Sequence, residues 1–315
     1  MDSATRQRQR GVAVITALLL TTLAITIVAS LFWQQQVQVR SIENQRLQLQ
    51  SVWIIRGALD WAGLILREDA KYSSIDDLDE PWAVPLAETR LDQYIENGRA
   101  DADTSDAALS GRISDAQARY NLTNLCSNGV INPTEVAVFE RMLTNVHLDT
   151  TLAQKTADMM AMSQQKPVDA AANTGDQVAP QPMKLLQVND LLAVPGFTPE
   201  MLTKIMDFVI FLPRVSPINV NTASAEVLSA RVGALTLSDA TDLVESRKSA
   251  SFRDLADFSN RLQGKPFSAT GEKVSVTTNY FLVNGKVRIS RAKLGMQALI
   301  ERIDTNTRLI WIRER

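Results

Sequence analysis

The sequence contains one cysteine and one histidine, and these scarcities exclude several classes of protein. A single cysteine cannot form an internal disulfide or a cysteine zinc cluster, and a single histidine cannot build a multi-histidine metal site. Excess charge is also lacking, because 33 Lys and Arg stand against 35 Asp and Glu. Binding to nucleic acid over the whole chain usually needs a clear basic excess. What is present is 45% apolar residues in a chain of 315, enough for packed cores and roughly two domains.

Charged residues are absent from Val12 to Trp33. A helix of this length extends about 33 Å, enough to cross a hydrocarbon core of about 30 Å. Arg6, Arg8 and Arg10 precede the run, and basic flanking residues favour a cytoplasmic N-terminus. A cleaved secretory signal would end in small residues, whereas this run ends in Leu-Phe-Trp. We therefore predict a retained transmembrane helix over residues 12–33.

The helix is expected to continue beyond the membrane. Residues 40–71 contain no proline, and apolar side chains recur there at the spacing of one helical face. Residues 34–72 are therefore predicted to be the amphipathic half of one long helix. Such a helix cannot bury its apolar stripe alone, so we expect a sheet to pack on this half.

The residues around Gly11 resemble the class III signal of type IV pilins and pseudopilins. The sequence Arg-Gln-Arg-Gly ends at Gly11, and the apolar helix starts at Val12. In that family a prepilin peptidase cuts after the Gly on the cytoplasmic side and methylates the new N-terminus. The resemblance thus implies a leader peptide of residues 1–11, a cut between Gly11 and Val12, and N-methylation of Val12.

The fifth residue after this cut is Thr16, whereas most members of the family have Glu there. That Glu is thought to neutralise the N-terminal amine of the subunit ahead in the fibre. Its absence is usual in the protein K family of type II secretion systems, which segments 77–83 and 115–125 also resemble. The resemblance implies a minor pseudopilin at the tip of the secretion pseudopilus, where it initiates or caps assembly for the export of folded proteins across the outer membrane.

The same resemblance implies partners and a location. The expected partners are the minor pseudopilins of the I and J types, the rest of the pseudopilus, the prepilin peptidase and the inner membrane. The expected location is the bacterial inner membrane, crossed once, with the N-terminus in the cytoplasm and the C-terminal domain in the periplasm. No catalytic motif is found, so we expect a structural protein and not an enzyme.

Changes of pattern along the rest of the chain predict an α+β fold. Residues 73–125 are expected to form the first part of a pilin body, with a β-hairpin over 108–125. Residues 126–272 are predicted to be helical, with a flexible loop over 163–183. Residues 273–315 should contain C-terminal strands, with a type I′ turn at Asn284-Gly285 between strands 274–283 and 286–289. The predicted architecture is a pilin-like long N-terminal helix packed on an antiparallel sheet, with a large all-α domain inserted in the sheet.

Two segments of the predicted insert, 192–205 and 218–228, resemble helix-hairpin-helix units, so the insert is expected to be of the SAM-like or helix-hairpin-helix type. Such hairpins can bare backbone N–H groups to a phosphate, which leaves open an alternative function as a DNA-uptake or type IV pilus minor component. Here Gly196 is followed by Phe197 and lacks the second Gly of the motif. Residues 184–265 also carry nine basic and nine acidic side chains. A structural or protein-docking role is therefore favoured, and nucleic-acid binding is not expected.

An acidic loop follows the long helix and includes Asp76, Asp77, Asp79 and Glu80. Calcium is a hard cation that takes several oxygen ligands, and these carboxylates lie close enough in sequence to share one ion. The four residues are therefore a candidate calcium site, with a solvated acidic loop as the alternative. No other cofactor is expected.

Overall fold

The computed structural model describes residues 4–91, 107–164, 182–290 and 292–314. The chain divides into two compact units, one drawn from residues 1–56, 90–108 and 287–294 and the other from 57–89, 109–286 and 295–315. All the packing described below belongs to the second unit, except where α1 or the sheet strands continue into the first.

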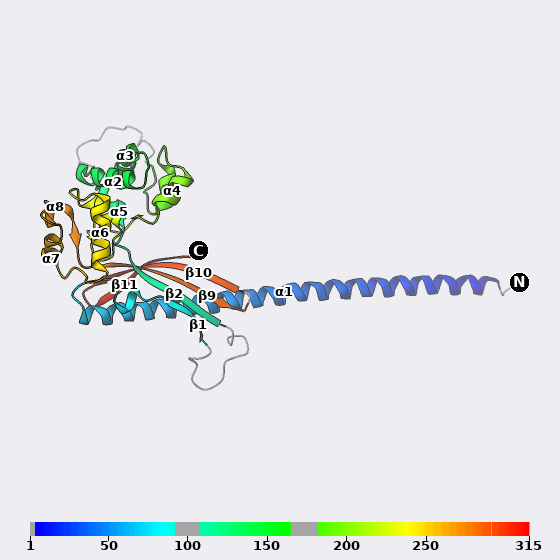
Figure 1. Ribbon diagram of the computed structural model, residues 1–315. Coiled ribbons are helices and arrows are strands. Elements are labelled where there is room, and N and C mark those ends of the chain that lie inside the picture. The colour runs from blue at the N-terminus through cyan, green and yellow to red at the C-terminus, as the bar shows by residue number, and fades with distance from the viewer. Residues whose placement is uncertain (1–3, 92–106, 165–181, 291, 315) are drawn as a thin grey trace, which may run out of the picture. The chain divides into compact units, whose positions relative to one another are not determined.

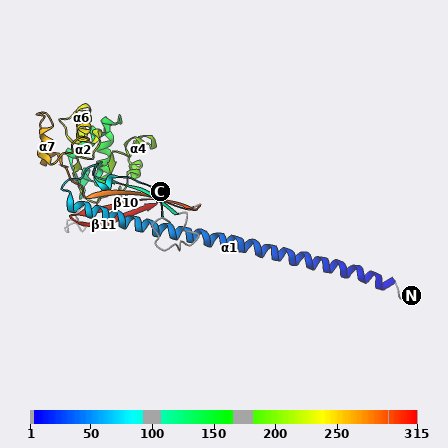
Figure 2. The same cartoon turned by 60° about the horizontal axis from the view of Figure 1, so that its bottom comes forward.

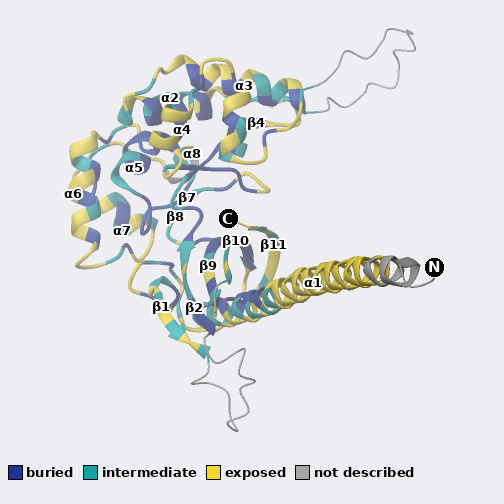
Figure 3. Cartoon of the chain, turned by 90° about the vertical axis from the view of Figure 1, so that its right-hand side faces the viewer, coloured by how far each residue is buried: buried dark blue, intermediate teal, exposed yellow. Residues whose placement is uncertain are grey.

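The predicted long helix is confirmed as α1, which runs without interruption from Ala4 to Tyr72 (Figure 1). Within the described residues it is the one helix long and apolar enough to cross a membrane. Its apolar run is exposed, and its buried positions lie near its C-terminal end (Figure 3). There Leu59, Ala62 and Leu66 recur at helical spacing on a buried face, with Leu66 fully buried. Arg67 Nη1 donates to Thr307 Oγ1 at 2.8 Å, so this half of α1 packs against the last strand of the sheet.

The main sheet has five strands in the order β1-β2-β9-β10-β11. The last two strands are antiparallel, with a bulge between Leu299 and Ile300, and they lie alongside the end of α1 (Figures 1 and 2). The chain leaves the sheet after β2 and returns to it at β9, so the helical region is inserted between neighbouring strands. The strands are β1 (Leu86–Arg90), β2 (Ala107–Asp115), β9 (Tyr280–Ile289), β10 (Ala292–Ile303) and β11 (Asn306–Glu314).

The inserted region has its own core, which includes buried side chains from Tyr120 to Val274. It is mainly helical, but it also contains three short two-stranded ladders that the all-α prediction omitted. Two of these ladders, β3–β6 and β7–β8, are parallel, and each joins segments far apart in sequence. The elements are β3 (Tyr120–Asn121), β4 (Cys126–Ser127), β5 (Val130–Ile131), α2 (Pro133–Asn145), α3 (Thr151–Ser163), α4 (Pro199–Ile205), β6 (Val209–Ile210), β7 (Ile218–Asn219), α5 (Ala225–Arg231), α6 (Leu237–Arg247), α7 (Leu255–Asn260), α8 (Ala269–Glu272) and β8 (Val274–Ser275), with 3-10 turns at Leu122–Leu125 and Val188–Ala193. A further 3-10 turn, Pro81–Ala83, lies between α1 and β1.

The predicted hairpin over residues 108–125 is wrong. Its first strand is β2 of the main sheet, but β3 pairs instead with β6 of the insert. The chain turns away because Asp115 Oδ1 accepts from the Gln117 N–H at 2.7 Å, a local turn that ends the strand.

The predicted turn at Asn284-Gly285 is also wrong, because β9 runs straight through both residues to Ile289. The expected strand 274–283 is divided, since β8 ends at Ser275 and pairs with β7. The glycines here serve close packing. A Cβ on Gly285 would lie 3.0 Å from Met296 Cε, and one on Gly111 would lie 2.7 Å from the Asn284 carbonyl oxygen. The C-terminal strands expected within residues 273–315 are confirmed as β9, β10 and β11.

Candidate functional site

The predicted processing site lies within α1. Thr16, the residue expected to mark a tip subunit, donates its Oγ1 hydroxyl to its own helix, at 3.1 Å from the Val12 carbonyl oxygen and 3.0 Å from that of Ala13. Thr21 and Thr26 bond their own helix in the same manner. The threonine hydroxyl groups of the span are therefore satisfied within the helix, and Thr16 offers no charge to a neighbouring subunit.

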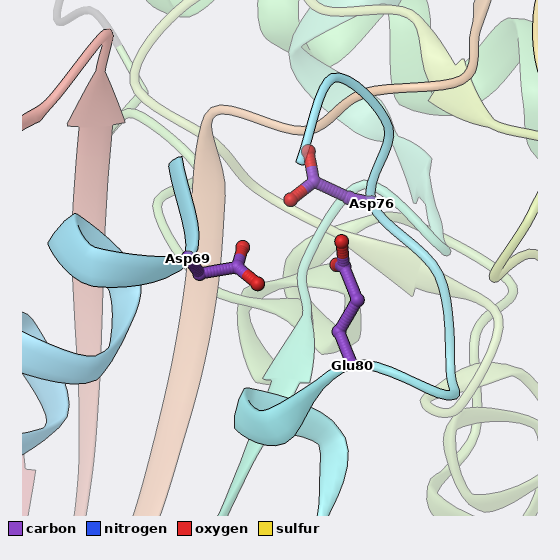
Figure 4. A group of neighbouring side chains, drawn as sticks. All are labelled: Asp69, Asp76 and Glu80. Carbon is purple, nitrogen blue, oxygen red and sulfur yellow. The ribbon is translucent and has the colours of Figure 1, made fainter. Parts of the chain in front are cut away.

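The predicted calcium ligands separate into two groups. Asp76 and Glu80 lie together with Asp69, and one carboxylate oxygen from each lies within 4.8 Å of the others (Figure 4). We call these three residues the carboxylate cluster. Asp77 and Asp79 are not members of it, because Asp77 Oδ1 instead accepts from the Asp79 N–H at 2.9 Å in a local turn.

Arg302, from β10, supplies the positive charge for the carboxylate cluster. Its Nη1 donates to Asp69 Oδ2 at 2.8 Å, and its Nη2 donates to Asp76 Oδ1. Glu80 Oε2 accepts from Trp82 Nε1 at 2.7 Å and from the Asp77 N–H at 3.2 Å. One guanidinium thus binds two of the three carboxylates. Burial raises the pKa of Asp69, Asp76 and Glu80 above their usual values.

The cluster fits calcium poorly. The ion takes six to eight oxygen ligands, but an oxygen of Asp69 and one of Asp76 are already occupied by Arg302. Calcium binding by Asp76, Asp77, Asp79 and Glu80 stays a prediction, and of these four residues only Asp76 and Glu80 lie in the carboxylate cluster. The sequence analysis missed Asp69, although it follows the buried Leu66 by three residues and so continues the buried face of the helix.

Next to the cluster, Asp115 joins the sheet to the insert. Its Oδ2 accepts from Asn219 Nδ2 at 2.9 Å and from Thr222 Oγ1 at 2.5 Å. Asn219 Nδ2 also donates to the Asp76 carbonyl oxygen at 2.9 Å. Complete burial raises the pKa of Asp115 from 3.8 to about 6. The end of β2, the acidic loop and the insert are thus held by one set of buried hydrogen bonds, which the sequence analysis did not anticipate.

The first helix-hairpin-helix segment has the glycine turn, but the backbone N–H after the glycine is bonded within the chain. Gly196 has a φ of +109°, and a Cβ there would lie 3.0 Å from Leu152 Cδ2 of α3. Phe197 is buried, and its N–H donates to the Val194 carbonyl oxygen at 3.2 Å. The Phe197 side of the turn therefore packs into the helical region, whereas Pro195 and Gly196 are exposed.

A buried ion pair organises the insert. The motif Asn132-Pro133-Thr134-Glu135 predicts that Glu135 helps to cap α2. Asn132 does cap this helix, but the Glu135 carboxylate binds both terminal nitrogens of Arg231, at 3.0 and 2.8 Å. Lys273 Nζ lies 3.1 Å from the same carboxylate, and Tyr120 donates its hydroxyl to it at 3.2 Å.

Two models of one family match consecutive parts of the chain. Both are described as type II secretion system (T2SS), protein K, and they match residues 118–214 and 218–278. Together they cover half of the sequence.

Characterised relatives match over almost the whole length. A type II secretion system protein K from Pseudomonas aeruginosa is 27% identical, and the match covers 94% of this chain and 90% of that protein. Proteins of the same name from Pectobacterium carotovorum and Klebsiella pneumoniae are 26% and 24% identical. Each of these two matches covers 94% of this chain and 93% of the relative.

The fold is also that of a solved structure. A chain in the crystal structure of the GspK-GspI-GspJ complex from the type 2 secretion system of enterotoxigenic Escherichia coli matches with a TM-score of 0.63 and 20% identity. The match covers 88% of this chain and 99% of that one. The predicted α+β architecture is confirmed by this likeness and by the sheet and helices described above. The chain belongs to the type II secretion system protein K family, the pseudopilins of that protein-transport machinery.

Proposed function

We propose that this chain is the minor pseudopilin at the tip of the type II secretion pseudopilus, where it initiates or caps assembly of the fibre for the export of folded proteins across the outer membrane. The observation that carries the proposal is Thr16. It occupies the place where most pilins of a fibre carry Glu, and its hydroxyl group is bonded to its own helix.

The electrostatics of the membrane explain why this residue suits the tip. A carboxylate within hydrocarbon is costly unless it is paired with a cation. Subunits below the tip can pair it with the N-terminal amine of the subunit ahead. A tip subunit has no such neighbour, and an uncharged side chain is more favourable there.

The proposed topology follows from the charge around α1. Arg6, Arg8 and Arg10 precede the apolar run and favour a cytoplasmic N-terminus. The chain would then cross the inner membrane once, lose residues 1–11 to the prepilin peptidase, and place its sheet and insert in the periplasm. In this location the protein acts by assembly and is not an enzyme.

The proposed partners are the minor pseudopilins of the I and J types. Support comes from the solved neighbour, which was crystallised as a GspK-GspI-GspJ complex. The insert adds bulk beyond a pilin body, which suits the end of a fibre better than a position within it.

Two variants at one position test the proposal. Thr16→Glu adds a carboxylate that finds no amine at the tip, at about 2–3 kcal/mol on insertion scales. We expect it to reduce the number of pseudopili per cell, measured by electron microscopy in a strain that overproduces the major pseudopilin. Thr16→Val has no charge and should leave that number unchanged. More pseudopili with Thr16→Glu than with wild type would contradict the tip assignment.

A further inference from the structure

A groove beside the last turns of α1 combines acidic and apolar side chains. It has a volume of about 670 Å³, and the helix and the loop over residues 73–81 form its sides. Five carboxylates line it, and the described residues place no lysine or arginine in the lining. These carboxylates are Glu68, Asp69, Asp77, Asp79 and Glu80.

The rest of the lining is mostly apolar. Leu64, Ile65, Ile75 and Pro81 contribute hydrocarbon surface, and Tyr72 extends from the end of the helix with 87% of its surface exposed. Leu64 is 47% exposed. Exposed aromatic and aliphatic side chains that surround a polar floor are typical of protein–protein contact sites.

One oxygen in this groove has no partner. Glu80 is 9% exposed and its Oε2 accepts two hydrogen bonds, whereas its Oε1 accepts none from any described residue. The carboxylate extends toward Asp69 and Asp76 (Figure 4). The nearby Ser73 hydroxyl donates to the Ile75 carbonyl oxygen at 2.7 Å. Buried acceptors are almost always satisfied in folded proteins, so this oxygen points to a donor that the described residues do not supply.

We propose that this groove is a docking site for a lysine or arginine side chain of a neighbouring pseudopilus subunit. The methylene stem of the side chain would lie along Leu64 and Tyr72, and its charged head would meet the carboxylates of Asp69 and Glu80. The inference rests on the proposed function, because it takes the partner to be another subunit of the fibre.

A long basic side chain fits the groove better than a metal ion. Calcium needs six to eight oxygens, but Arg302 and the Trp82 and Asp77 N–H groups already occupy an oxygen of each carboxylate in the cluster. The apolar walls supply no oxygen ligands for calcium, whereas they can pack against the hydrocarbon part of lysine or arginine. Glu68 of the rim already pairs with Lys71 at 2.6 Å. Asp77 and Asp79 form no ion pair with the described residues, so the rim still attracts a basic partner.

The test uses the full chain in cells with an active secretion system. Tyr72 is replaced by the photocrosslinking residue p-benzoyl-phenylalanine, an aromatic change at an exposed site. After irradiation we expect one dominant adduct to another pseudopilin, and mass spectrometry should place it within three residues of a Lys or Arg in that partner.

Charge variants then test the chemistry of the groove. Glu68→Lys with Asp79→Lys changes two exposed rim residues and should lower the adduct yield at least tenfold. Glu80→Gln should lower it as well. The matched control is Glu245→Lys with Asp242→Lys, the same change of charge on the insert, which should leave the yield unchanged. When this chain carries Glu68→Lys and Asp79→Lys, replacing the crosslinked Lys or Arg of the partner by Glu should restore the adduct yield.

Three results would overturn the inference. They are an adduct at a partner segment without a basic residue, an adduct unaffected by the rim variants, and an adduct abolished by the calcium chelator EGTA, which would assign the groove to a metal ion.

Failure of the inference is separable from failure of the proposed function. If the I-type and J-type proteins still copurify with a chain that gives no adduct, only the inference fails, whereas loss of copurification in the wild type would contradict the proposed function.

Discussion

Asp115 lies at the end of β2, where it accepts hydrogen bonds from Asn219 and Thr222 of the insert. Burial raises the pKa of this carboxyl group to about 6. An acid with a raised pKa favours the folded state most when it is protonated. Its contribution to stability is therefore full below the unfolded value of 3.8 and is lost as pH rises through about 6.

We predict that Asp115→Asn flattens the pH dependence of folding. The rise in the pKa of Asp115 from 3.8 to about 6 corresponds to about 3 kcal/mol. The wild type should lose this amount of its free energy of unfolding between pH 4 and pH 7. Asparagine does not titrate between pH 4 and pH 7, so the free energy of unfolding of the variant should vary less over this range. Urea unfolding of the full chain in detergent micelles, followed by tryptophan fluorescence, measures the difference. Equal slopes for both proteins would show that Asp115 titrates normally.

Glu135 presents the opposite case, a charged carboxylate that is stabilised by its partners. Burial acts to raise its pKa, but the Arg231 guanidinium and the Lys273 ammonium outweigh it and hold the pKa below its usual value. Arg231 is only 2% exposed, and its Nε has no hydrogen-bond partner among the described residues, so the arginine depends on Glu135 for compensation.

Removing this carboxylate should be costly. Glu135→Gln leaves the Arg231 charge buried, and we expect a loss of roughly 3–5 kcal/mol in the free energy of unfolding. Glu245→Gln is the matched control, since Glu245 pairs with Lys248 at the surface and both are more than half exposed. That control should change the stability by about 0.5 kcal/mol or less. A loss for Glu135→Gln no larger than that of the control would show that the pair does not stabilise the insert.

Among the elements, the sheet and α1 use glycine in different ways. Gly111 of β2 has no room for a side chain, because a Cβ would lie 2.7 Å from the Asn284 carbonyl oxygen. A Cβ on Gly57 of α1 would meet nothing within 4 Å.

The two alanine substitutions should therefore change the free energy of unfolding in opposite directions. Gly111→Ala forces β2 and β9 apart and should lower the free energy of unfolding by roughly 1–3 kcal/mol. Gly57→Ala relieves the entropic disadvantage of glycine inside a helix and should raise it by roughly 0.5–1 kcal/mol. Thermal unfolding of both variants under one condition provides the comparison. A stabilising Gly111→Ala would contradict the close approach of these strands.

The elements that the sequence predicted correctly are those with a local signal. The continuous α1 follows from an apolar run with no proline, and the start of α4 follows from Thr198-Pro199, where Thr198 Oγ1 accepts from the Met201 N–H. Errors arose where distant residues decide. Asn221 has a side chain typical of a helix N-terminus, but it binds the backbone of Phe252, and α5 begins after Ser224 instead.

The same division holds for the site. Asp76 and Glu80 were found because they are close in sequence. Asp69, Arg302 and Asp115 were missed because the fold brings them to the loop from α1, β10 and β2. No pattern within the sequence links Arg302 to Asp76, which is 226 residues away.

For the whole molecule, processing is the first requirement of the proposed function. Gly11→Val should block cleavage by the prepilin peptidase, leave a full-length precursor in the inner membrane and abolish secretion. Mass spectrometry of the wild-type protein should identify N-methylated Val12 as its first residue. An intact Met1 on wild-type protein in a secreting cell would contradict the processing that we propose.

The position of the chain along the fibre is the central claim. A subunit that lacks the membrane carboxylate cannot neutralise the amine of a neighbour ahead of it, so each fibre should contain this chain at one end only. The most direct measurement is to shear pseudopili from an overproducing strain and locate the chain with a gold-labelled antibody against the insert. We predict a single label at one end of each fibre and none along the shaft. Label along the shaft, at spacings comparable with those of the major pseudopilin, would contradict the tip assignment and the explanation given for Thr16.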